Sequence, residues 1–477
     1  MNYFNELKKD KWKLASLLLL LALVAMFIYI VTILSNYFEG KILIAAIVGI
    51  VVLVALLAIT HYKFPKSTLV IELLLIAICI FASSVLGKVD EVAENISEVK
   101  EYEVVQIVAH KDSGITSEDD FSSYVLGYVN SDNDAYERSS EILAENSKVV
   151  SKSRPYKTTD EVYSSLLSKS IELMVLTNDT KVDLSMIDED YSDKIVVLFE
   201  KQYEIEQVEA DAVDISTEPF TVYFQGTDLS SGDNISSTGR GDVNILLTVN
   251  PVSEQVYLQV IPRDTFVYIP CRGGSSKLSY SGWWGGVQSS IKSIEDKFDI
   301  KINYYAKINF NGLTDLVDAL GGVEVYSHYT YESHSYYFQE GYNYVDGDQA
   351  LVFARTRKIL PQNELSRGQH QMELIKGIFK KFAENPTYDN AMSVIDSLSS
   401  NFITNIPKED YYDVFSLVVK LLPELQNMEN HSITGEYQWH YDEVRPTYYQ
   451  YYYYPEESEI ERVRNNIQAI LDGKIIE

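Results

Sequence analysis

The sequence predicts a membrane-anchored α/β protein: three N-terminal transmembrane helices, a small α+β accessory domain, and a layered α/β domain with a central mixed sheet flanked by helices. The supporting observations are three apolar runs at the N-terminus, an acidic segment with alternating strand and helix patterns, and a longer segment of strands interspersed with helices. The chain of 477 residues is long enough for two or three domains of roughly 150 residues. Its 46% hydrophobic content excludes a disordered chain.

The apolar runs cover about residues 14–34, 42–60 and 68–86, and each approaches the roughly 20 residues with which a helix crosses a bilayer core. A cleavable signal peptide has a single such run, so we expect three transmembrane helices over residues 14–87. A buried soluble helical hairpin is the alternative. Glu72 lies in the third run, where a helix–helix contact is favoured over a functional role.

Positive charge sets the expected orientation. Lysines cluster before the first run and between the second and third, whereas the loop between the first and second has one lysine. These residues are Lys8, Lys9, Lys11, Lys13, Lys63 and Lys66, against Lys41. By the positive-inside rule, residues 1–13 form a cytoplasmic tail and everything after residue 87 is extracellular. We therefore expect a multi-pass protein of the bacterial cell membrane, with the lipid bilayer as a partner.

The predicted accessory domain, residues 88–217, carries 30 acidic and 12 basic side chains. A helical pattern over residues 159–176 alternates with strand-like runs such as 103–109 and 194–199, which indicates a small α+β fold. Because the segment lacks a His pair, a glycine-rich phosphate loop and a nucleophile motif, we expect a spacer or protein-contact role. The net charge of −29 for the whole chain argues against nucleic acid as a partner.

Residues 218–477 form the predicted catalytic domain, with a motif-rich core at 218–385. Asn250-Pro251 separates two β-rich runs and predicts a hairpin. The predicted strands are 220–226, 242–250, 254–261, 301–309 and 323–326, and the predicted helices are 283–298, 312–320 and 365–382. Six tyrosines between residues 448 and 454 could stack on sugar rings, but an aromatic-rich strand is the favoured interpretation.

Arginine is scarce, with 11 in the chain, yet six fall between residues 240 and 367. They are Arg240, Arg263, Arg272, Arg355, Arg357 and Arg367. Arginine binds phosphate oxygens in a bidentate manner, so this concentration suggests an anion site. For any one of them alone, a surface ion pair is the favoured explanation.

Spacing refines this set. Arg355 and Arg357 share a face only in an extended segment, so we expect the helix of residues 347–353 to end before them. Arg367 and Gln371 are four residues apart on the following helix and share a face.

Two carboxylates accompany the arginines. Asp228 follows the strand of residues 220–226, and Asp242 opens the next strand beside Arg240. Together they suit Mg²⁺, with Mn²⁺ as an alternative, bridging phosphate oxygens, although an Asp that caps a turn is the favoured explanation for either alone. Asp264 could pair with a neighbouring arginine or orient it.

These residues lie in runs that resemble the LytR-CpsA-Psr family. The runs are Arg240-Gly241-Asp242, Ile261-Pro262-Arg263-Asp264-Thr265, Asn311-Gly312-Leu313 to Gly321-Gly322-Val323, Asp346-Gly347, Ala350 to Lys358, and Arg367 with Gln371. The resemblance is dense over about residues 218–385. The three-span anchor with an acidic accessory domain is similar to the CpsA branch, which is linked to capsule.

The resemblance implies a phosphotransferase that moves a polysaccharide, on this branch a capsular one, from a polyprenyl-pyrophosphate carrier to peptidoglycan. Matching motif positions imply metal ligation by Asp228 and Asp242. They imply phosphate binding by Arg240, Arg263, Arg355, Arg357, Arg367 and Gln371. Catalysis would fall to Asp242, Asp264 and Arg263, with either aspartate as the candidate base. Capsule-assembly proteins are further candidate partners.

The sequence departs from the family pattern at two positions near the closing motif. Glu364 stands where the family often has Asp, and His370 where a second Arg is common. These departures affect the expected acid chemistry rather than the lipid phosphate site.

A polyprenyl chain needs an apolar tunnel, for which the sequence offers candidates. They are Leu313, Leu316, Leu320, Leu351, Phe353, Ile375, Ile378 and Phe379. An ordinary core is the favoured role for them. The competing functions are an envelope regulatory protein and a module that binds lipid-linked polymer without transferring it.

Overall fold

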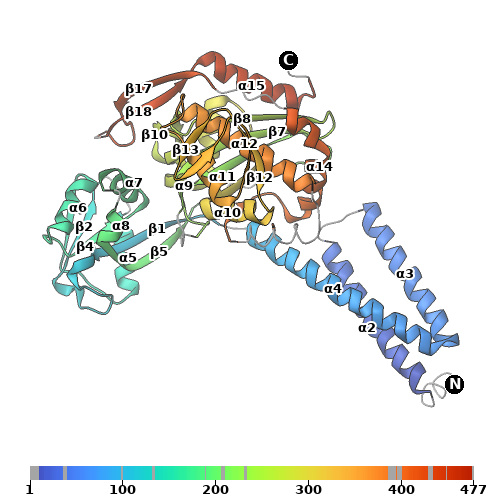
Figure 1. Ribbon diagram of the computed structural model, residues 1–477. Helices are drawn as coiled ribbons and strands as arrows, with labels where there is room; N and C mark the ends of the chain where they lie inside the picture. The colour runs from blue at the N-terminus through green and yellow to red at the C-terminus, as the bar shows by residue number, and fades with distance from the viewer. Residues whose placement is uncertain are drawn as a thin grey trace.

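The computed structural model describes residues 10–35, 40–97, 100–130, 135–188, 190–205, 210–229, 234–384, 394, 400–427, 433–446 and 448–474. Figure 1 shows three long helices leaving the larger C-terminal body on one side, while a smaller α+β body lies on another side. Lys8 and Lys9, on which the expected orientation partly depends, lie outside the described residues.

The three N-terminal helices confirm the predicted apolar spans. They are α2 (Lys11–Leu34), α3 (Gly40–Lys63) and α4 (Pro65–Ser97). Each is long and apolar enough to cross a membrane. Glu72 is fully buried on α4, in the part of the helix that packs against its neighbours, as expected for a helix–helix contact.

The N-terminal α+β unit (residues 100–205) contains a five-stranded sheet in the order β3-β2-β4-β1-β5. Its strands are β1 (Tyr102–His110), β2 (Val125–Val129), β3 (Lys152–Tyr156), β4 (Leu173–Leu176) and β5 (Ile195–Glu204). Its helices are α5 (Ala135–Glu145), α6 (Thr159–Leu167), α7 (Asn178–Ile187) and α8 (Tyr191–Lys194). The expected strands at 103–109 and 194–199 are confirmed.

The predicted helix over residues 159–176 is wrong in its second half. Helix α6 ends at Leu167, and Lys169 adopts a positive φ of 58° that reverses the chain. All four residues of β4 are buried in the middle of the sheet. A fully buried strand shows no alternation, so its apolar run extended the helical pattern without a break.

The larger α/β unit (residues 210–474) is built on a mixed sheet in the order β16-β11-β6-β7-β8. Strands β6 and β11 run parallel and the other neighbours antiparallel. The strands are β6 (Phe220–Thr227), β7 (Gly241–Asn250), β8 (Gln255–Val260), β11 (Tyr304–Asn309) and β16 (Phe402–Thr404). The predicted hairpin around Asn250-Pro251 is confirmed.

Helices cover both faces of this sheet. They are α9 (Leu278–Phe298), α10 (Phe310–Ala319), α11 (Gly347–Arg355), α12 (Glu364–Glu384), α14 (Tyr411–Asn427) and α15 (Glu457–Leu471). Tyr223 of β6 packs with α9 and α15, whereas its neighbour Val222 packs with α12 and α14. Successive strand residues point to opposite faces, so a single strand contributes to both cores of a three-layer unit.

Short strand pairs complete the α/β unit. They are β9 (Phe266–Ile269) with β10 (Gly274–Lys277), β12 (Val323–Ser327) with β15 (Gly341–Val345), β13 (Tyr331–Ser333) with β14 (Tyr336–Phe338), and β17 (Gly435–Tyr441) with β18 (Tyr449–Pro455). The tyrosine-rich tail therefore forms the strand that its composition favoured.

The break within α9 receives a side chain from the other unit. The predicted helix of residues 283–298 begins earlier, at Leu278, and is interrupted at Gly285 and Gly286. A Cβ on Gly286, whose φ is +66°, would lie 2.3 Å from Oε2 of Glu101. That carboxylate accepts hydrogen bonds from the Val287 N–H (2.6 Å) and the Lys307 ammonium (2.7 Å). Only glycine leaves room for this contact between the units.

Candidate functional site

A single large cavity of about 1050 Å³ opens in the α/β unit beside the central sheet. Seven of the eight residues considered for a tunnel line it, namely Leu313, Leu316, Leu320, Leu351, Ile375, Ile378 and Phe379. These seven residues line the cavity as well as contributing to the core: Leu320 is a buried core residue, and Leu313, Leu316, Ile375, Ile378 and Phe379 pack against the core from the cavity wall. Phe353 does not line the cavity and is fully buried against Phe338 and His370.

The remaining wall of the cavity is cationic. Each residue that was expected to contact phosphate lines it, namely Arg240, Arg263, Arg355, Arg357, Arg367 and Gln371. They come from the start of β7, the end of β8, the α11–α12 connection and α12. The sequence-based grouping is therefore correct in space for five of the six clustered arginines. It is wrong for Arg272, which pairs with Asp179 of the α+β unit at 3.1 Å and does not line the cavity.

The position of Arg355 differs slightly from expectation. Helix α11 does not end before Arg355 but includes it as the last residue, and Thr356 then adopts an extended conformation (φ −61°, ψ 128°). Arg355 and Arg357 thus flank one extended residue, and both still line the cavity. The Thr356 N–H donates to the Val352 carbonyl (3.0 Å), which closes the helix at this point.

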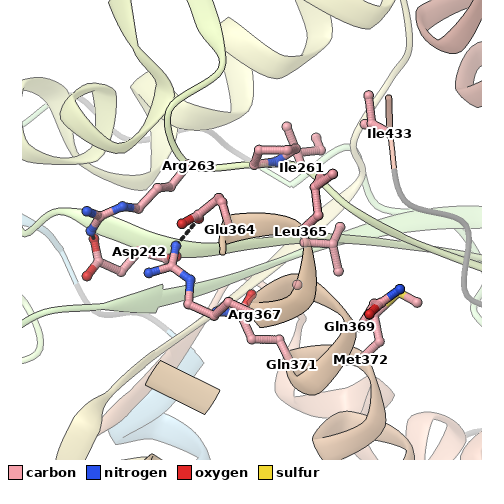
Figure 2. A pocket seen from close by; sticks show the side chains of 13 residues that line it. Asp242, Ile261, Arg263, Glu364, Leu365, Arg367, Gln369, Gln371, Met372 and Ile433 are labelled. Atoms are coloured by element: carbon pink, nitrogen blue, oxygen red, sulfur yellow. Dashed lines mark hydrogen bonds and ion pairs between the residues drawn. The ribbon is translucent and has the colours of Figure 1, made fainter. Parts of the chain in front are cut away.

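Asp242 lies between Arg263 and Arg367 (Figure 2). Its Oδ1 accepts a hydrogen bond from Nη1 of Arg263 at 2.7 Å and lies 3.4 Å from Nε of Arg240. Its backbone carbonyl accepts from Nη2 of Arg367 at 3.3 Å. Burial opposes ionisation, but Arg263, Arg240 and Arg367 together hold the pKa of Asp242 below its ordinary value.

The carboxylate of Asp228 holds both the backbone and the side chain of Arg240. Its two carboxylate oxygens accept from the Arg240 backbone N–H (2.8 Å) and from Nη2 (2.7 Å). Trp283 stacks over the same guanidinium, with 5.6 Å between Cζ and the ring centroid. Arg240 is therefore held by two carboxylates and an aromatic face.

Glu364 takes the position at which the family often has Asp. Its carboxylate pairs with Arg367 and lies 3.7 Å from Nη1 of Arg357. In Figure 2 this pair sits directly beside Asp242. The longer side chain thus still reaches two arginines of the site.

The other departure, His370, does not reach the site. Its ring is fully buried and stacks on Phe353 (4.1 Å) and Tyr331 (5.5 Å). It packs into the core beside these rings, and it does not line the cavity.

Charge in the site is unbalanced. Five arginines line the cavity, whereas their acidic contacts are Asp228, Asp242 and Glu364. Arg355 instead lies over the ring of Phe310, with 4.2 Å between Cζ and the centroid. The Nε atoms of Arg240, Arg263 and Arg367 are buried without a hydrogen-bond partner among the described residues. Excess cations with unused donors suit a multiply charged anion.

Asp264 does not line the cavity. It is buried and forms an ion pair with Lys277 at 3.0 Å, while its second oxygen has no hydrogen-bond partner within the described chain. Of the predicted acids, only Asp242 contacts the cavity directly.

Metal binding can be judged from the available donors. Across the described residues, no group of three or more His, Cys, Asp and Glu side chains is arranged to hold a metal. Asp228 and Asp242 instead share Arg240 as a partner. Two carboxylates fit Mg²⁺, which commonly takes one or two carboxylates and completes its shell with substrate phosphates and water.

Sequence reasoning missed three contributors to the site. The ring of Trp283 lies against Arg240, and the ring of Phe310 lies against Arg355. Lys358 lines the cavity together with the arginines. Lys358 follows Arg357 directly, so basic clustering could have identified it. The two aromatic rings had no local signal, because each reaches its arginine only through the tertiary fold.

Fold and site together define a protein with three membrane-spanning candidate helices and an apolar cavity that ends in an arginine cluster. The pattern of the LytR_cpsA_psr family matches residues 190–469, and the chain belongs to this family.

Two curated relatives are named polyisoprenyl-teichoic acid–peptidoglycan teichoic acid transferase TagU. The protein from Halalkalibacterium halodurans is 33% identical over 227 residues, which cover 47% of this chain and 73% of the relative. The protein from Enterococcus faecalis is 33% identical over 213 residues, or 44% and 70% of the two chains. A solved structure of a Streptococcus agalactiae protein is 24% identical, with a TM-score of 0.49 over 56% of this chain and 93% of that one.

Proposed function

We propose that this protein is a phosphotransferase that moves a capsular polysaccharide from a polyprenyl-pyrophosphate carrier to peptidoglycan. The observation that carries the proposal is one cavity with two chemistries, an apolar wall for the polyprenyl chain and a cationic wall for the diphosphate. The names of the TagU relatives support transfer of a polyisoprenyl-linked polymer to peptidoglycan. The similarity to the CpsA branch supports a capsular polymer over a teichoic acid.

In this proposal the arginines and Gln371 bind the diphosphate oxygens and stabilise the charge that builds up on them. A hydroxyl oxygen of the acceptor attacks the polymer-bearing phosphorus in line, and the bond from that phosphorus to the bridging oxygen breaks. Polyprenyl phosphate leaves with the bonding electrons, and the hydroxyl proton passes to a base. Asp242 is the cavity carboxylate for that role, while Asp264, held by Lys277, orients neighbouring groups from behind.

Mg²⁺ or Mn²⁺ held by Asp228 and Asp242 would supply further positive charge at the diphosphate. The chain's own residues would orient it, because Arg240 already fixes both carboxylates. We also propose that the N-terminus is cytoplasmic and the α/β unit extracellular, where peptidoglycan and capsule-assembly proteins are accessible.

Reconstitution tests the function. The full chain in lipid nanodiscs, given Mg²⁺, a polyprenyl-pyrophosphate-linked oligosaccharide and peptidoglycan, should form covalently attached polymer. Arg355→Ala should abolish transfer without unfolding the protein, because Arg355 is exposed and stacks only on Phe310. Arg154→Ala, at an exposed arginine of the α+β unit, is the matched control and should transfer normally.

The alternative of a binding module makes a different prediction in the same assay. Wild-type protein would retain the lipid-linked oligosaccharide in an Arg355-dependent manner but show no turnover. A regulatory protein would show neither retention nor turnover. Turnover by Arg355→Ala at the wild-type rate would contradict the proposed role of the arginine cluster.

A further inference from the structure

The hairpin of β17 and β18 presents a continuous row of aromatic rings on one face. In its antiparallel register, Tyr437 opposes Tyr453, Trp439 opposes Tyr451, and Tyr441 opposes Tyr449. Alternate residues of a strand point to the same face, so all six rings lie together. We call these six residues the aromatic ladder.

Neighbouring rings of the ladder touch one another along its whole length. Five ring pairs have centroids 5.0 to 5.9 Å apart, in stacked, tilted and edge-on arrangements. The outer rings are nevertheless open to solvent, since Trp439 is 60%, Tyr441 62% and Tyr449 56% exposed. Contiguous exposed apolar surface of this kind marks an interaction site more often than chance does.

The outer part of this face is not used for packing by the fold. Its inner end is, since Tyr453 is 1% exposed and belongs to the core of the α/β unit, and the Lys277 ammonium lies 4.1 Å from the ring centroid of Tyr451. The opposite face of the hairpin packs inward, where His440, Tyr452 and Tyr454 surround the ring of Phe266 on β9. The hairpin is therefore anchored by its inward face and by Tyr453, and it displays Trp439, Tyr441 and Tyr449 to solvent.

The inner end of the ladder reaches the candidate site. The backbone N–H of Tyr453 donates to the carbonyl of Asp264 (2.8 Å), and its hydroxyl donates to the carbonyl of Ile433 (2.6 Å). Ile433 lines a small cavity together with Arg263 and Glu364 (Figure 2). The ladder thus starts beside the arginine cluster and runs outward from it.

The chemistry of the ladder selects its occupant. The segments Gly435–Tyr441 and Tyr449–Pro455 contain no lysine or arginine, and Lys277, which lies over Tyr451, is already paired with Asp264 at 3.0 Å. This face therefore does not suit an anionic polymer. Flat, polarisable rings with exposed faces suit the C–H faces of pyranose sugars. A lipid surface is the competing partner for exposed Trp and Tyr. However, Figure 1 shows β17 and β18 on the side of the α/β unit away from α2, α3 and α4.

We propose that the aromatic ladder binds the glycan strand of the acceptor peptidoglycan and delivers its hydroxyl to the arginine cluster. This inference rests on the proposed function for the identity of the acceptor. In this proposal the lipid-linked donor approaches from the membrane side and the acceptor from the opposite side, since Figure 1 shows β17 and β18 on the side of the α/β unit away from α2, α3 and α4.

The test uses the full chain in nanodiscs and the double variant Trp439→Ala/Tyr449→Ala. Retention on purified peptidoglycan is measured without donor, and the KM values for glycan acceptor and lipid-linked donor are measured separately. We expect retention to fall, and acceptor KM to rise, about fivefold or more, with kcat and donor KM within about twofold of wild type. Trp439→Phe, which keeps a ring, should recover most of the loss.

Tyr337→Ala is the matched control, because Tyr337 of β14 is 69% exposed but lies outside the ladder. Unchanged retention and acceptor KM in the double variant would overturn the proposal. A rise in donor KM instead would assign the ladder to the donor polymer, and loss of binding to protein-free vesicles would assign it to the membrane; either outcome overturns it. Because retention needs no turnover, ladder-dependent retention by a wild-type protein without transfer activity would refute the proposed function alone.

Discussion

Arginines contact carboxylates in two regions of this molecule, and their surroundings differ. At the contact between the two units, Arg445 pairs with Asp183 at 2.6 Å and lies 4.0 Å from Asp442. Three rings, of Tyr280, Trp284 and Tyr448, enclose its guanidinium. At the cavity, five arginines line the wall, and their ion pairs are with three carboxylates, of which only Asp242 lines the cavity.

The difference distinguishes an arginine that stabilises the fold from arginines that are available to bind a ligand. Two carboxylates and three aromatic rings surround the single guanidinium of Arg445, so it stabilises the contact it lies in, although its Nε and Nη2 form no hydrogen bond among the described residues. Where guanidiniums outnumber their carboxylate partners, their mutual repulsion and desolvation lower the stability of the site until an anion binds. The comparison therefore predicts that the two regions respond in opposite ways to mutation.

The largest effect on stability should follow removal of Arg445. Arg445→Met leaves the carboxylate of Asp183 buried without its cation and should cost about 3–5 kcal/mol of unfolding free energy. Thermal and urea unfolding of the full chain in detergent measure this. The double variant Arg445→Met/Asp183→Asn should recover much of the loss, and equal destabilisation of both variants would refute the matched-pair interpretation.

A large effect on activity, like that expected for Arg355→Ala, should follow removal of Arg263, which contacts Asp242 at the cavity. Arg263→Ala should lower kcat about 10²–10³-fold, since a preorganised cation at the reacting phosphate is lost. Arg263→Lys keeps the positive charge but not the fork-shaped guanidinium, so its kcat should lie between those of the wild type and Arg263→Ala. Transfer at the wild-type rate in Arg263→Ala would remove the distinction between the two regions.

Filling the apolar wall should have a smaller and more selective effect. Leu316→Trp places a large ring in the cavity and should lower transfer from a long polyprenyl donor about tenfold. A donor with a short prenyl chain should be affected about twofold or less, because it does not occupy the deep part. Equal loss with both donors would indicate a general packing defect instead.

The smallest expected effect is on the pH dependence of stability, and it tests whether His370, a buried residue outside the site, is kept neutral. Burial lowers the pKa of His370 to about 4, from an ordinary value near 6.5. The unfolded chain therefore binds the proton first as the pH falls, so stability is complete above about 6.5 and is lost toward pH 4, by about 3 kcal/mol at most. His370→Gln should flatten this part of the profile. An unchanged slope in the variant would assign the effect to another group.

Sequence reasoning succeeded where the signal was local or repeated. The apolar runs predicted α2, α3 and α4, alternation predicted β6, and β-rich runs around Asn250-Pro251 predicted β7 and β8. Arginine clustering predicted residues that meet in one cavity, because each lies at the end of a strand or helix. Whether these residues bind phosphate or metal stays a prediction.

The failures have physical causes. Buried strand β4 looked like the end of helix α6, since both are continuously apolar. The cavity wall could not be told from ordinary core, because Leu316 or Ile378 has the same pattern whether it faces protein atoms or empty space. The pairs Glu101–Lys307 and Asp183–Arg445 join residues more than 200 positions apart, and no local pattern encodes them.

Helix α4 has a mechanical consequence. Its 33 residues would extend about 50 Å at 1.5 Å per residue, roughly 20 Å more than a bilayer core of about 30 Å. A few residues after it, Glu101 is locked into α9. A long helix whose C-terminal end is followed by a fixed contact with the α/β unit holds that unit at a set distance from the bilayer. The length of α4 therefore sets the height of the arginine cluster above the bilayer. If the proposed function holds, inserting whole helical turns into α4 would move the cluster away from a lipid-linked donor and lower transfer.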